Sequence, residues 1–353
     1  MSLSKFLCGK KIFVTGHTGF KGSWLCFVLH KFGADVTGFS LQPEEKSLFQ
    51  AANVASFVNH NIGDINTVGD LKTQLLLCEP DIVIHLAAQP LVRLSYELPL
   101  TTFQTNVMGT ANLLHAANEC PKKPIVAIIT SDKCYENRET NRPYVETDPM
   151  GGHDPYSASK GAAELISRSF AKSFYLKNNQ SIITLRGGNV IGGGDWSDDR
   201  IMTDLVAALR SNERPVLRSP KSIRPWQHIL DVISGYLTAI QYASSQENAT
   251  FEQFNIGPTS TNIASVCELA TLVCNNWGNK LRPLYATESA DLHEAKILKL
   301  DISKARQVLG WQPKYDLKET VSKTVAWYLS HEMGADMFEV TTHQVNDYFL
   351  ESV

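Results

Sequence analysis

A tyrosine and a lysine four residues apart form the first candidate for chemistry, in the segment Tyr156-Ser157-Ala158-Ser159-Lys160. At the start of a helix this spacing puts both side chains on one face. A phenol, with an ordinary pKa near ~10, is a poor base at neutral pH, but an adjacent ammonium favours the phenolate. Tyr156 is therefore predicted to take the proton of a substrate hydroxyl while a hydride leaves the same carbon, with Lys160 supporting it. The alternative is a tyrosine and a lysine that merely share an exposed surface.

The triplet Ser131-Asp132-Lys133 follows an apolar run, 124–130, that is typical of a buried strand. Open parallel sheets bind their ligands at the carboxyl ends of the strands. Ser131 is predicted to hydrogen-bond the reacting oxygen and to complete a Ser–Tyr–Lys group. Asp132 and Lys133 are surplus to a simple hydride transfer, so this adjacent pair of titratable groups indicates a second acid–base step. The alternative is a local ion pair in a loop.

Three glycines, spaced GxxGxxG, lie between a predicted strand at 12–15 and a predicted helix at 20–32. Glycines let the backbone turn tightly and approach a pyrophosphate, which the N-terminus of the following helix stabilises. The segment is therefore predicted to bind a dinucleotide, and the alternative is a tight turn with no ligand. The predicted contacts in this turn are Gly16, His17, Thr18, Gly19, Phe20 and Gly22.

The ends of the neighbouring strands favour NAD over NADP. An acidic residue normally follows the second strand and binds the adenosine ribose, but Ser40 stands at that place. Ser40 is expected to bind the ribose more loosely, and no arginine follows that would favour a 2′-phosphate. Tyr156 and Lys160 are expected to contact the cofactor as well. The remaining predicted cofactor contacts are Asp64, Ile65, Leu86, Ala87 and Ala88.

These residues need a parallel sheet to bring them together, and the pattern of the chain predicts one. Short apolar runs alternate with helical patterns in the first half, which is typical of an α/β fold with helices on both faces of the sheet. We expect a doubly wound, Rossmann-like domain over 1–188, with a helix and a strand returning to it near 226–258. A smaller, mostly helical substrate lobe is expected over 189–353. The predicted helices are 20–32, 71–78, 102–118, 156–175, 201–211 and 228–243, and the predicted strands are 12–15, 34–39, 81–86, 124–130, 181–186 and 254–256.

The composition limits the possible partners and location. The chain has 353 residues with a net charge of -3, so nothing indicates a nucleic-acid or acidic-membrane surface. No apolar stretch is long enough to span a membrane, and a strand pattern beginning at Lys10 leaves no room for a signal peptide. The seven cysteines are odd in number and scattered, which favours reduced thiols in the cytoplasm over disulfides or a zinc site, and no metal is expected.

Several segments together resemble the extended short-chain dehydrogenases, over about residues 9 to 330. They include VTGHTGFKGSW, HLAAQPLVRLSY, TNVMGT, TSDKCYEN, GGHDPYSASKGAAE, RGGNVIGGGDW, RPWQHILD and LDISKARQVLGWQP. The resemblance is strongest to nucleotide-sugar 4,6-dehydratases. It implies NAD as cofactor and CDP-glucose as substrate, with oxidation at C4, loss of water across C5 and C6, and return of the hydride to C6.

The resemblance also implies roles for single residues. Asp132 would protonate the departing 6-hydroxyl. Relatives that act on dTDP-glucose carry a glutamate where this chain has Lys133, so Lys133 is either the base that takes the C5 proton or an electrostatic stabiliser of the enolate. Arg218 and Arg224 would suit a diphosphate, because a guanidinium binds phosphate oxygens in a fork. The other substrate contacts that we expect are Asn189, Arg93, His228 and Glu294.

Two questions stay open on the sequence alone. In relatives, helices corresponding to 102–118 and 156–175 form a four-helix dimer interface, so a homodimer or homotetramer is expected here. Competing functions are a nucleotide-sugar 4-epimerase, which does not need Asp132 and Lys133, a dehydratase of another nucleotide-glucose, and a non-catalytic NAD-binding sensor.

Overall fold

Seven parallel strands form the central sheet, in the order β10-β6-β5-β4-β1-β2-β3. The computed structural model describes residues 1–259, 262–278, 281–285 and 297–350. The order places a topological switch point between β1 and β4, where ligands of such sheets bind beyond the carboxyl ends of the strands. The predicted doubly wound, Rossmann-like sheet is confirmed. Its strands are β1 Lys11–Thr15, β2 Asp35–Ser40, β3 Asn59–Ile62, β4 Ile82–His85, β5 Ile125–Ser131, β6 Ile182–Gly187 and β10 Phe251–Ile256.

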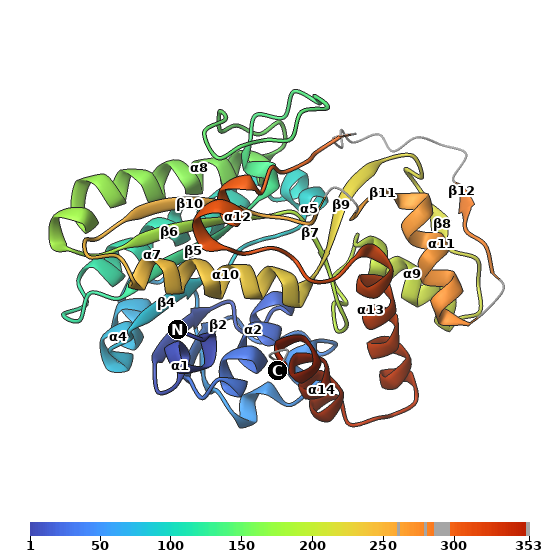
Figure 1. The fold of residues 1–353 in the computed structure, drawn as a ribbon, viewed down its shortest axis with the longest axis horizontal. Coiled ribbons are helices and arrows are strands. Elements are labelled where there is room, and N and C mark those ends of the chain that lie inside the picture. Colours follow the sequence, from blue (N-terminus) through green and yellow to red (C-terminus); the bar gives the residue numbers. More distant parts are fainter. Residues whose placement is uncertain (260–261, 279–280, 286–296, 351–353) are drawn as a thin grey trace.

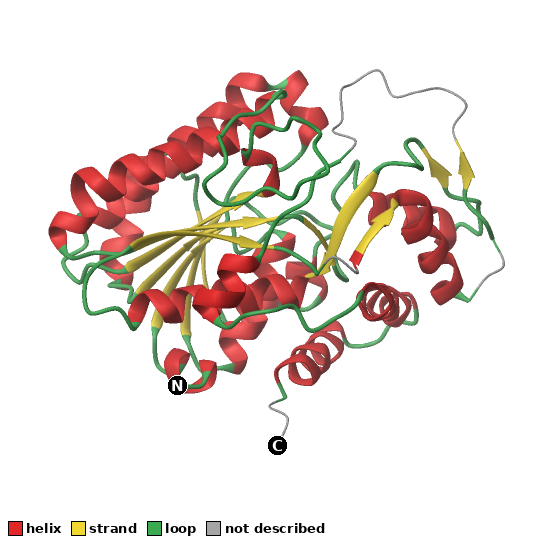
Figure 2. Ribbon diagram, turned by 45° about the horizontal axis from the view of Figure 1, so that its top comes forward, coloured by secondary structure: helices red, strands yellow, loops and turns green. Residues whose placement is uncertain are grey.

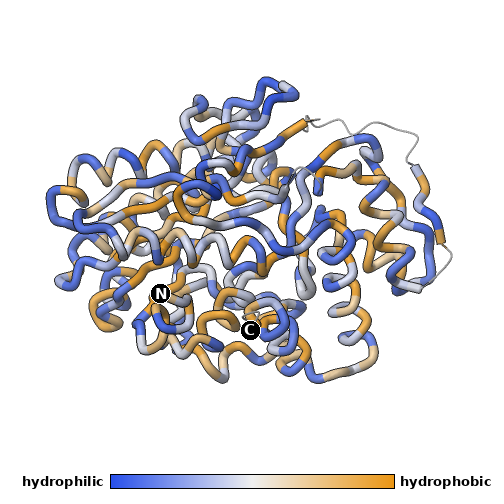
Figure 3. The backbone as a smooth tube through the Cα atoms, viewed as in Figure 1, coloured by the Kyte–Doolittle hydropathy of each residue, from blue (hydrophilic) through white to orange (hydrophobic). Residues whose placement is uncertain are grey.

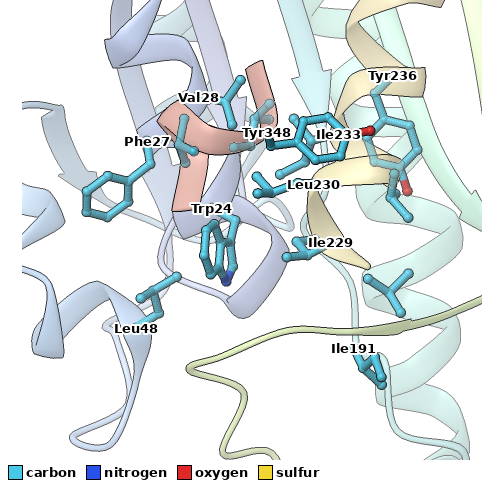
Figure 4. Close-up of a cluster of buried hydrophobic side chains, with 14 of the residues drawn as sticks. Trp24, Phe27, Val28, Leu48, Ile191, Ile229, Leu230, Ile233, Tyr236 and Tyr348 are labelled. Atoms are coloured by element: carbon cyan, nitrogen blue, oxygen red, sulfur yellow. The ribbon is translucent and has the colours of Figure 1, made fainter. Parts of the chain in front are cut away.

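Helices cover both faces of the sheet (Figures 1 and 2). Alternate strand residues point to opposite faces, so Ile12 and Val14 join one buried cluster while Phe13 joins the other. The first cluster lies under α2 Phe20–Lys31 and α10 Ile229–Ser244. Figure 4 shows Trp24 of α2 beside Ile229 and Leu230 of α10, while Phe27 points away from α10. The second lies under the helices of the opposite face, α4 Val68–Cys78, α7 Gly109–Asn118 and α8 Pro155–Phe170.

Two long helices on the second face each contain a π-helical turn. The helix predicted over 102–118 consists of α6 Pro99–Phe103, the π turn η2 Gln104–Met108 and α7. The helix predicted over 156–175 consists of α8 and the π turn η4 Ala171–Tyr175. Such turns are frequent at functional sites. Short elements complete this domain: α1 Leu3–Leu7, α3 Leu48–Ala51, η1 Val54–Ser56, α5 Val92–Glu97, η3 Asp132–Cys134 and η5 Leu176–Asn178.

A three-stranded sheet, β11-β9-β7, leads from the large sheet into the smaller lobe. Its strands are β7 Asn189–Ile191, β9 Ile223–His228 and β11 Ile263–Ser265. Two further strands, β8 Val216–Leu217 and β12 Leu284–Tyr285, pair with each other beside α9 Ile201–Arg210 and α11 Val266–Trp277, at the right of Figure 1. The strands β8 and β12 were not predicted, because runs of two residues show no periodicity.

The C-terminal helices connect the two lobes. They are α12 Ser303–Leu309, α13 Leu317–Glu332 and α14 Met337–Phe349. The α13 helix packs against α11 in the smaller lobe, whereas α14 returns to α2 on the large domain. Among the described residues, no helix is long and apolar enough to cross a membrane.

Candidate active site

The start of α8 fixes Tyr156 at the edge of the sheet. Asp154 caps the helix, with its carboxylate accepting from the Ser157 amide at 2.9 Å and the Ser157 hydroxyl at 2.6 Å. Pro155 occupies the first helical position, where its missing N–H costs nothing. The Tyr156 amide donates to Ser95 Oγ at 3.2 Å, which ties the first turn of α8 to α5.

Burial changes the titration of both members of the tyrosine–lysine pair. Burial raises the pKa of Tyr156 to about 12; the Ser131 hydroxyl and Arg200 lower it, and Asp132 and Asp154 raise it. Burial lowers the pKa of Lys160 to about 8, against Cys134 and Glu164, which raise it. The phenol therefore needs further positive charge nearby before it can act as a base, and the effect of Lys160 on it stays a prediction.

The Ser131-Asp132-Lys133 triplet lies where β5 ends and the short helix η3 begins. The Ser131 hydroxyl donates to Asp132 Oδ1 at 3.0 Å and accepts from the Lys133 amide at 3.2 Å. Ser131 also interacts with the Tyr156 phenol, so the structure brings these two residues together beside Asp132, and Lys160 follows Tyr156 by four residues on α8.

Asp132 lies in a strongly charged but buried environment. Its side chain is 2% exposed, and Oδ2 has no hydrogen-bond partner among the described residues. Burial raises the pKa of this carboxyl, while Lys133, the Ser131 hydroxyl, Arg224 and Lys21 lower it. A carboxyl that favours the protonated form can serve as a general acid.

A buried ion pair supports this group from below. Arg186 of β6 donates from Nη2 to Glu164 Oε2 of α8 at 2.9 Å, and both side chains are at most 1% exposed. Glu164 also accepts from the hydroxyls of Thr130 and Thr184, so the pair joins β5, β6 and α8 just below Ser131 and Tyr156. This network fixes the distance between the helix that carries Tyr156 and the strand that ends at Ser131.

The glycine turn has the geometry that a pyrophosphate site requires. Gly16 has φ +75°, and a Cβ there would lie 2.6 Å from the Ala87 amide nitrogen. A Cβ at Gly22 would lie 2.1 Å from Gly16 O, so neither position admits a side chain. Gly19, the N-cap of α2, is exposed, and a Cβ there would meet only Gly16 O at 3.5 Å. Packing therefore explains two of the glycines and leaves the third open toward a ligand.

The other predicted cofactor contacts follow the ends of β2, β3 and β4. The Ser40 hydroxyl lies 2.8 Å from that of Thr18, so the end of β2 is linked to the glycine turn. Asp64 accepts from the Asn66 amide, and Ile65 is buried against Gly109 of α7. Leu86, Ala87 and Ala88 follow β4 next to Gly16.

Similarity to known proteins identifies the family. The sequence profile described as GDP-mannose 4,6-dehydratase matches residues 13–324. The chain belongs to the GDP-mannose 4,6-dehydratase family. A CDP-glucose 4,6-dehydratase of Salmonella typhimurium is 42% identical to it over 97% of both chains. The resemblance to extended short-chain dehydrogenases is thereby confirmed.

Solved structures share the fold at lower identity. A UDP-glucose 4-epimerase of Thermotoga maritima with UDP-glucose has a TM-score of 0.80 and 23% identity, and the alignment covers 91% of this chain and 99% of that one. MoeE5 in complex with UDP-glucuronic acid and NAD has a TM-score of 0.75 and 24% identity over the same shares of both chains. The family's Rossmann-like architecture is therefore common to epimerases and dehydratases.

Of the residues predicted to bind substrate, the structure brings two arginines to one acidic residue. Arg93 and Arg218 reach Asp199 Oδ1 at 3.5 and 3.0 Å, respectively. Arg224, on β9, is 5% exposed and lies within electrostatic range of Asp132. Asn189 begins β7, opposite Trp226 of β9.

Two of the predicted site residues, His228 and His17, lie in the core. His228 is fully buried, and its Nδ1 accepts from the Leu230 amide as the N-cap of α10; burial lowers its pKa to about 3. His17 is fully buried too, with Nε2 2.6 Å from His60 Nδ1. In this family member, the His228 side chain therefore stabilises a helix start. Glu294 lies outside the described residues.

Sequence reasoning missed three side chains that lie close to this group. Lys21 of α2 and Tyr236 of α10 both approach Gly187 at the end of β6. Arg200, which precedes α9, influences Tyr156 and Lys21 and lies 3.6 Å from Asp195. A lysine in the otherwise apolar first half of α2, within FKGSWLCF, was the only sequence signal for any of them.

A cavity of about 620 Å³ lies in the smaller lobe, away from these residues. Its lining is mostly apolar and includes Ile223, Ile263 and Tyr285. None of Ser131, Asp132, Lys133, Tyr156 and Lys160 lines it. Within the described part of the chain, no group of three or more His, Cys, Asp or Glu side chains could hold a metal ion.

Proposed function

We propose that this protein is an NAD-dependent lyase that converts CDP-glucose to CDP-4-keto-6-deoxyglucose. The observation that carries the proposal is the buried carboxyl of Asp132 beside Ser131, Tyr156 and Lys160, because hydride transfer alone needs no second acid. The 42% identity to the Salmonella CDP-glucose 4,6-dehydratase supports the choice of reaction and of substrate.

The turn after β1 fits NAD. Gly19 is open on its exposed side, and the amides at the start of α2 can receive a pyrophosphate. The NAD bound to MoeE5, which has the same fold, supports the same cofactor here. We propose contacts through Gly16, His17, Thr18, Gly19, Phe20 and Gly22, and through Ser40, Asp64, Ile65, Leu86, Ala87 and Ala88. When bound, NAD would accept the C4 hydride and later return it to C6.

The residues of this chain would act in two stages. Tyr156 would take the proton of the 4-hydroxyl, with the Ser131 hydroxyl holding that oxygen and Lys160 adding positive charge. The 4-ketone makes the C5 proton acidic. Asp132 would then protonate the 6-oxygen as water leaves, and Lys133 would either take the C5 proton or stabilise the enolate while another group takes that proton.

The arginines of the smaller lobe would hold the diphosphate. Arg93 and Arg218 both contact Asp199. A diphosphate bound between them would replace the Asp199 carboxylate as the anion that the two guanidinium groups bind. Arg224 would approach from β9 and Asn189 from β7. We keep His228 and Glu294 as weaker candidates, because His228 already caps α10.

Product analysis tests the proposal directly. The purified protein would be incubated with NAD and one of three substrates, CDP-, dTDP- or UDP-glucose. The mass of each product would be measured by mass spectrometry. We expect CDP-glucose alone to lose one water, without accumulating NADH. Unchanged mass with an inverted C4 centre by NMR would establish a 4-epimerase instead.

A single substitution separates an enzyme from a non-catalytic sensor. Tyr156→Phe removes the proposed base and leaves the fold of α8 unchanged, because the N-cap of this helix is Asp154 and the phenol hydroxyl takes no part in it. We expect turnover to fall by a factor on the order of 10² or more, as for loss of a general base, while NAD affinity stays within a few-fold. Turnover that persists in this variant would contradict the assigned role.

We also propose that the protein forms a homodimer, or a homotetramer built from such dimers, through the face formed by α6, η2, α7 and α8. The helices contact one another along this face, and α8 carries hydrophobic residues among hydrophilic ones (Figure 3). Several large apolar side chains of these helices are exposed, namely Leu100, Phe103, Met108 and Leu165, and so is Phe174 in the π turn η4 that continues α8. Exposed apolar groups that cluster on one face commonly mark an interface.

A further inference from the structure

Three polar side chains outside the Ser–Tyr–Lys group converge on the glycine pair Gly187–Gly188 at the end of β6. They come from three elements: Lys21 from α2, Tyr236 from α10 and Asp132 from η3. The Tyr236 hydroxyl lies 3.1 Å, and the Lys21 ammonium 4.0 Å, from the position that a Cβ at Gly187 would take. Asp132 Oδ2 lies 3.4 Å from the corresponding position at Gly188. The glycine pair therefore leaves room for all three groups to approach one stretch of backbone.

None of the three groups makes all the hydrogen bonds or ion pairs that it could form. Tyr236 is 1% exposed and Asp132 2%, yet the Tyr236 hydroxyl and Asp132 Oδ2 have no hydrogen-bond partner among the described residues. The Lys21 side chain is only half-buried, and its ammonium forms no hydrogen bond or ion pair with the residues that the structure describes. Unsatisfied buried polar groups are costly, and their presence in a folded protein calls for a functional explanation.

The charges of Lys21 and Asp132 act on each other. Burial raises the pKa of Asp132, and Lys21 is one of the cations that lower it. Burial lowers the pKa of Lys21 to about 8, and Asp132 is one of the anions that raise it. The other groups that face this pair are Lys133 and Ser131 of the triplet, Arg224 of β9, Lys160 and Tyr156 of α8, and Arg200 and Asp195 of the loop after β7.

We propose, on the basis of the dehydratase function above, that Lys21 is a positioning residue of the elimination step, whose ammonium stabilises the carboxylate that Asp132 becomes on giving up its proton. In that step the O–H bond of Asp132 and the C6–O bond of the sugar break, and water leaves. The C5–H bond breaks as well: its proton passes to a base, for which Lys133 in its neutral form is the candidate, and its electron pair forms the C5=C6 double bond. A carboxylate that forms in a buried site is unfavourable unless cations face it. Lys133 and Arg224 face it from two sides, and Lys21 faces it from α2.

The titration of Asp132 tests this inference without any substrate. Full-length protein with NAD would be labelled with ¹³C at the aspartate carboxyls, and the Asp132 signal would be identified by its absence in Asp132→Asn. We expect the Asp132 midpoint to rise by about one pH unit in Lys21→Met, since a unit corresponds to a tenfold change in the equilibrium. Lys21→Arg should keep the wild-type midpoint, and Lys31→Met, at the exposed far end of the same helix, is the matched control. An unchanged midpoint in Lys21→Met would overturn the inference.

Single-turnover experiments with CDP-glucose add a readout that a structural role would not move. In Lys21→Met we expect NADH to form at the wild-type rate, while loss of water slows about tenfold, so that the 4-keto sugar with its 6-oxygen accumulates. The basic limb of the pH–rate profile should move to higher pH, because a weaker acid stays protonated longer. Lys21→Arg should restore both. Equal slowing of both steps would contradict a role through Asp132.

These two measurements also keep the inference apart from the function it rests on. If wild-type protein dehydrates no nucleotide-glucose but the Asp132 midpoint still moves in Lys21→Met, the proposed function fails and the coupling stands. If wild-type protein dehydrates CDP-glucose and the midpoint does not move, the coupling fails and the function stands.

Discussion

The three glycines of the turn after β1 differ in what surrounds them, and this difference predicts different effects of an added methyl group. A Cβ at Gly22 would lie 2.1 Å from a backbone oxygen, whereas one at Gly19 would meet only ordinary contact at 3.5 Å. We expect Gly22→Ala to destabilise the protein by about 1–3 kcal/mol, as overpacking does. Gly19→Ala should leave thermal stability almost unchanged and weaken NAD binding about tenfold, because the methyl group occupies the approach of the pyrophosphate.

Calorimetric titration with NAD, together with thermal unfolding without it, measures the two effects separately. Gly69, which has nothing within 4 Å of its would-be Cβ and lies in α4, is the control for helix propensity. Tight NAD binding by Gly19→Ala would show that the turn does not approach the cofactor as proposed.

The sequence predicted the proximity of Ser131 and Tyr156 because Ser131 ends a recognisable strand and Tyr156 begins a recognisable helix. It could not predict Lys21. The direction of that side chain depends on where the start of α2 lies relative to the end of β6, and on a glycine pair more than 160 residues away that leaves space for it. Neither the position of α2 nor the space beside the glycine pair can be derived from the sequence around Lys21.

At the scale of elements, the ion pair between Glu164 and Arg186 holds α8 against β6. Both side chains are at most 1% exposed, so Glu164→Gln would leave the guanidinium charge buried without its counter-ion. We expect a loss of about 3–5 kcal/mol in the free energy of unfolding, measured in urea. The double variant Glu164→Gln/Arg186→Met should recover part of that loss, since it removes the unpaired charge.

An exposed pair provides the matched control for this experiment. Glu136 and Arg138 lie 2.9 Å apart with side chains 49% and 66% exposed, so Glu136→Gln should change stability by less than about 1 kcal/mol. Equal effects of the buried and the exposed substitution would show that burial of the Glu164 pair is not what stabilises α8.

A second buried carboxyl links α10 to the C-terminal helix α14. Asp231 Oδ1 accepts from the Tyr348 hydroxyl and the Lys314 amide, both at 2.7 Å, and burial raises the pKa of Asp231 from 3.8 to about 6. Because the folded state holds this proton more tightly than the unfolded state, the stabilising contribution is complete below about pH 4. It is lost as the pH rises through about 6.

Asp231→Asn removes this titration and can keep both hydrogen bonds through its amide oxygen. We expect the stability of the variant relative to wild type to increase by on the order of 2–3 kcal/mol between pH 4 and pH 7 and then to level off. Unfolding in urea across this pH range measures the difference. A difference that does not depend on pH would mean that Asp231 is ionised in the folded state at all these values.

The elements that the sequence missed are those in which tertiary contacts override local pattern. Predicted helices 102–118 and 156–175 exist, but their π turns arise where buried side chains fix the backbone; Asn106, within the first, donates to Gln89 O and Ser159 Oγ. The strands of the second sheet, such as β7 and β11, have only three residues each. Their pairing depends on β9, so no short-range signal could reveal them.

At the scale of the whole molecule, a single chain leaves large apolar side chains exposed on the face formed by α6, η2, α7 and α8. Leu100 is 82% and Leu165 58% exposed there, although α8 otherwise packs closely on α6, η2 and α7. The same helices carry Ser159 and Asn106, whose hydrogen bond holds the start of α8 beside η2. Association through this face would therefore stabilise the helix that carries Tyr156 and Lys160, and assembly would be coupled to the active site.

Charged substitutions on this face test both parts of that argument. We expect wild-type protein, of 39.2 kDa per chain, to have at least twice this mass by light scattering during size-exclusion chromatography. Leu100→Asp/Leu165→Asp should be monomeric, because burying two carboxylates in an apolar interface costs several kcal/mol. Leu77→Asp, at a 73% exposed leucine of α4, should leave the mass unchanged. If the face also supports α8, the monomeric variant will bind NAD more weakly and unfold at a lower temperature. A wild-type monomer at micromolar concentration, or equal dissociation by Leu77→Asp, would exclude this face as the interface.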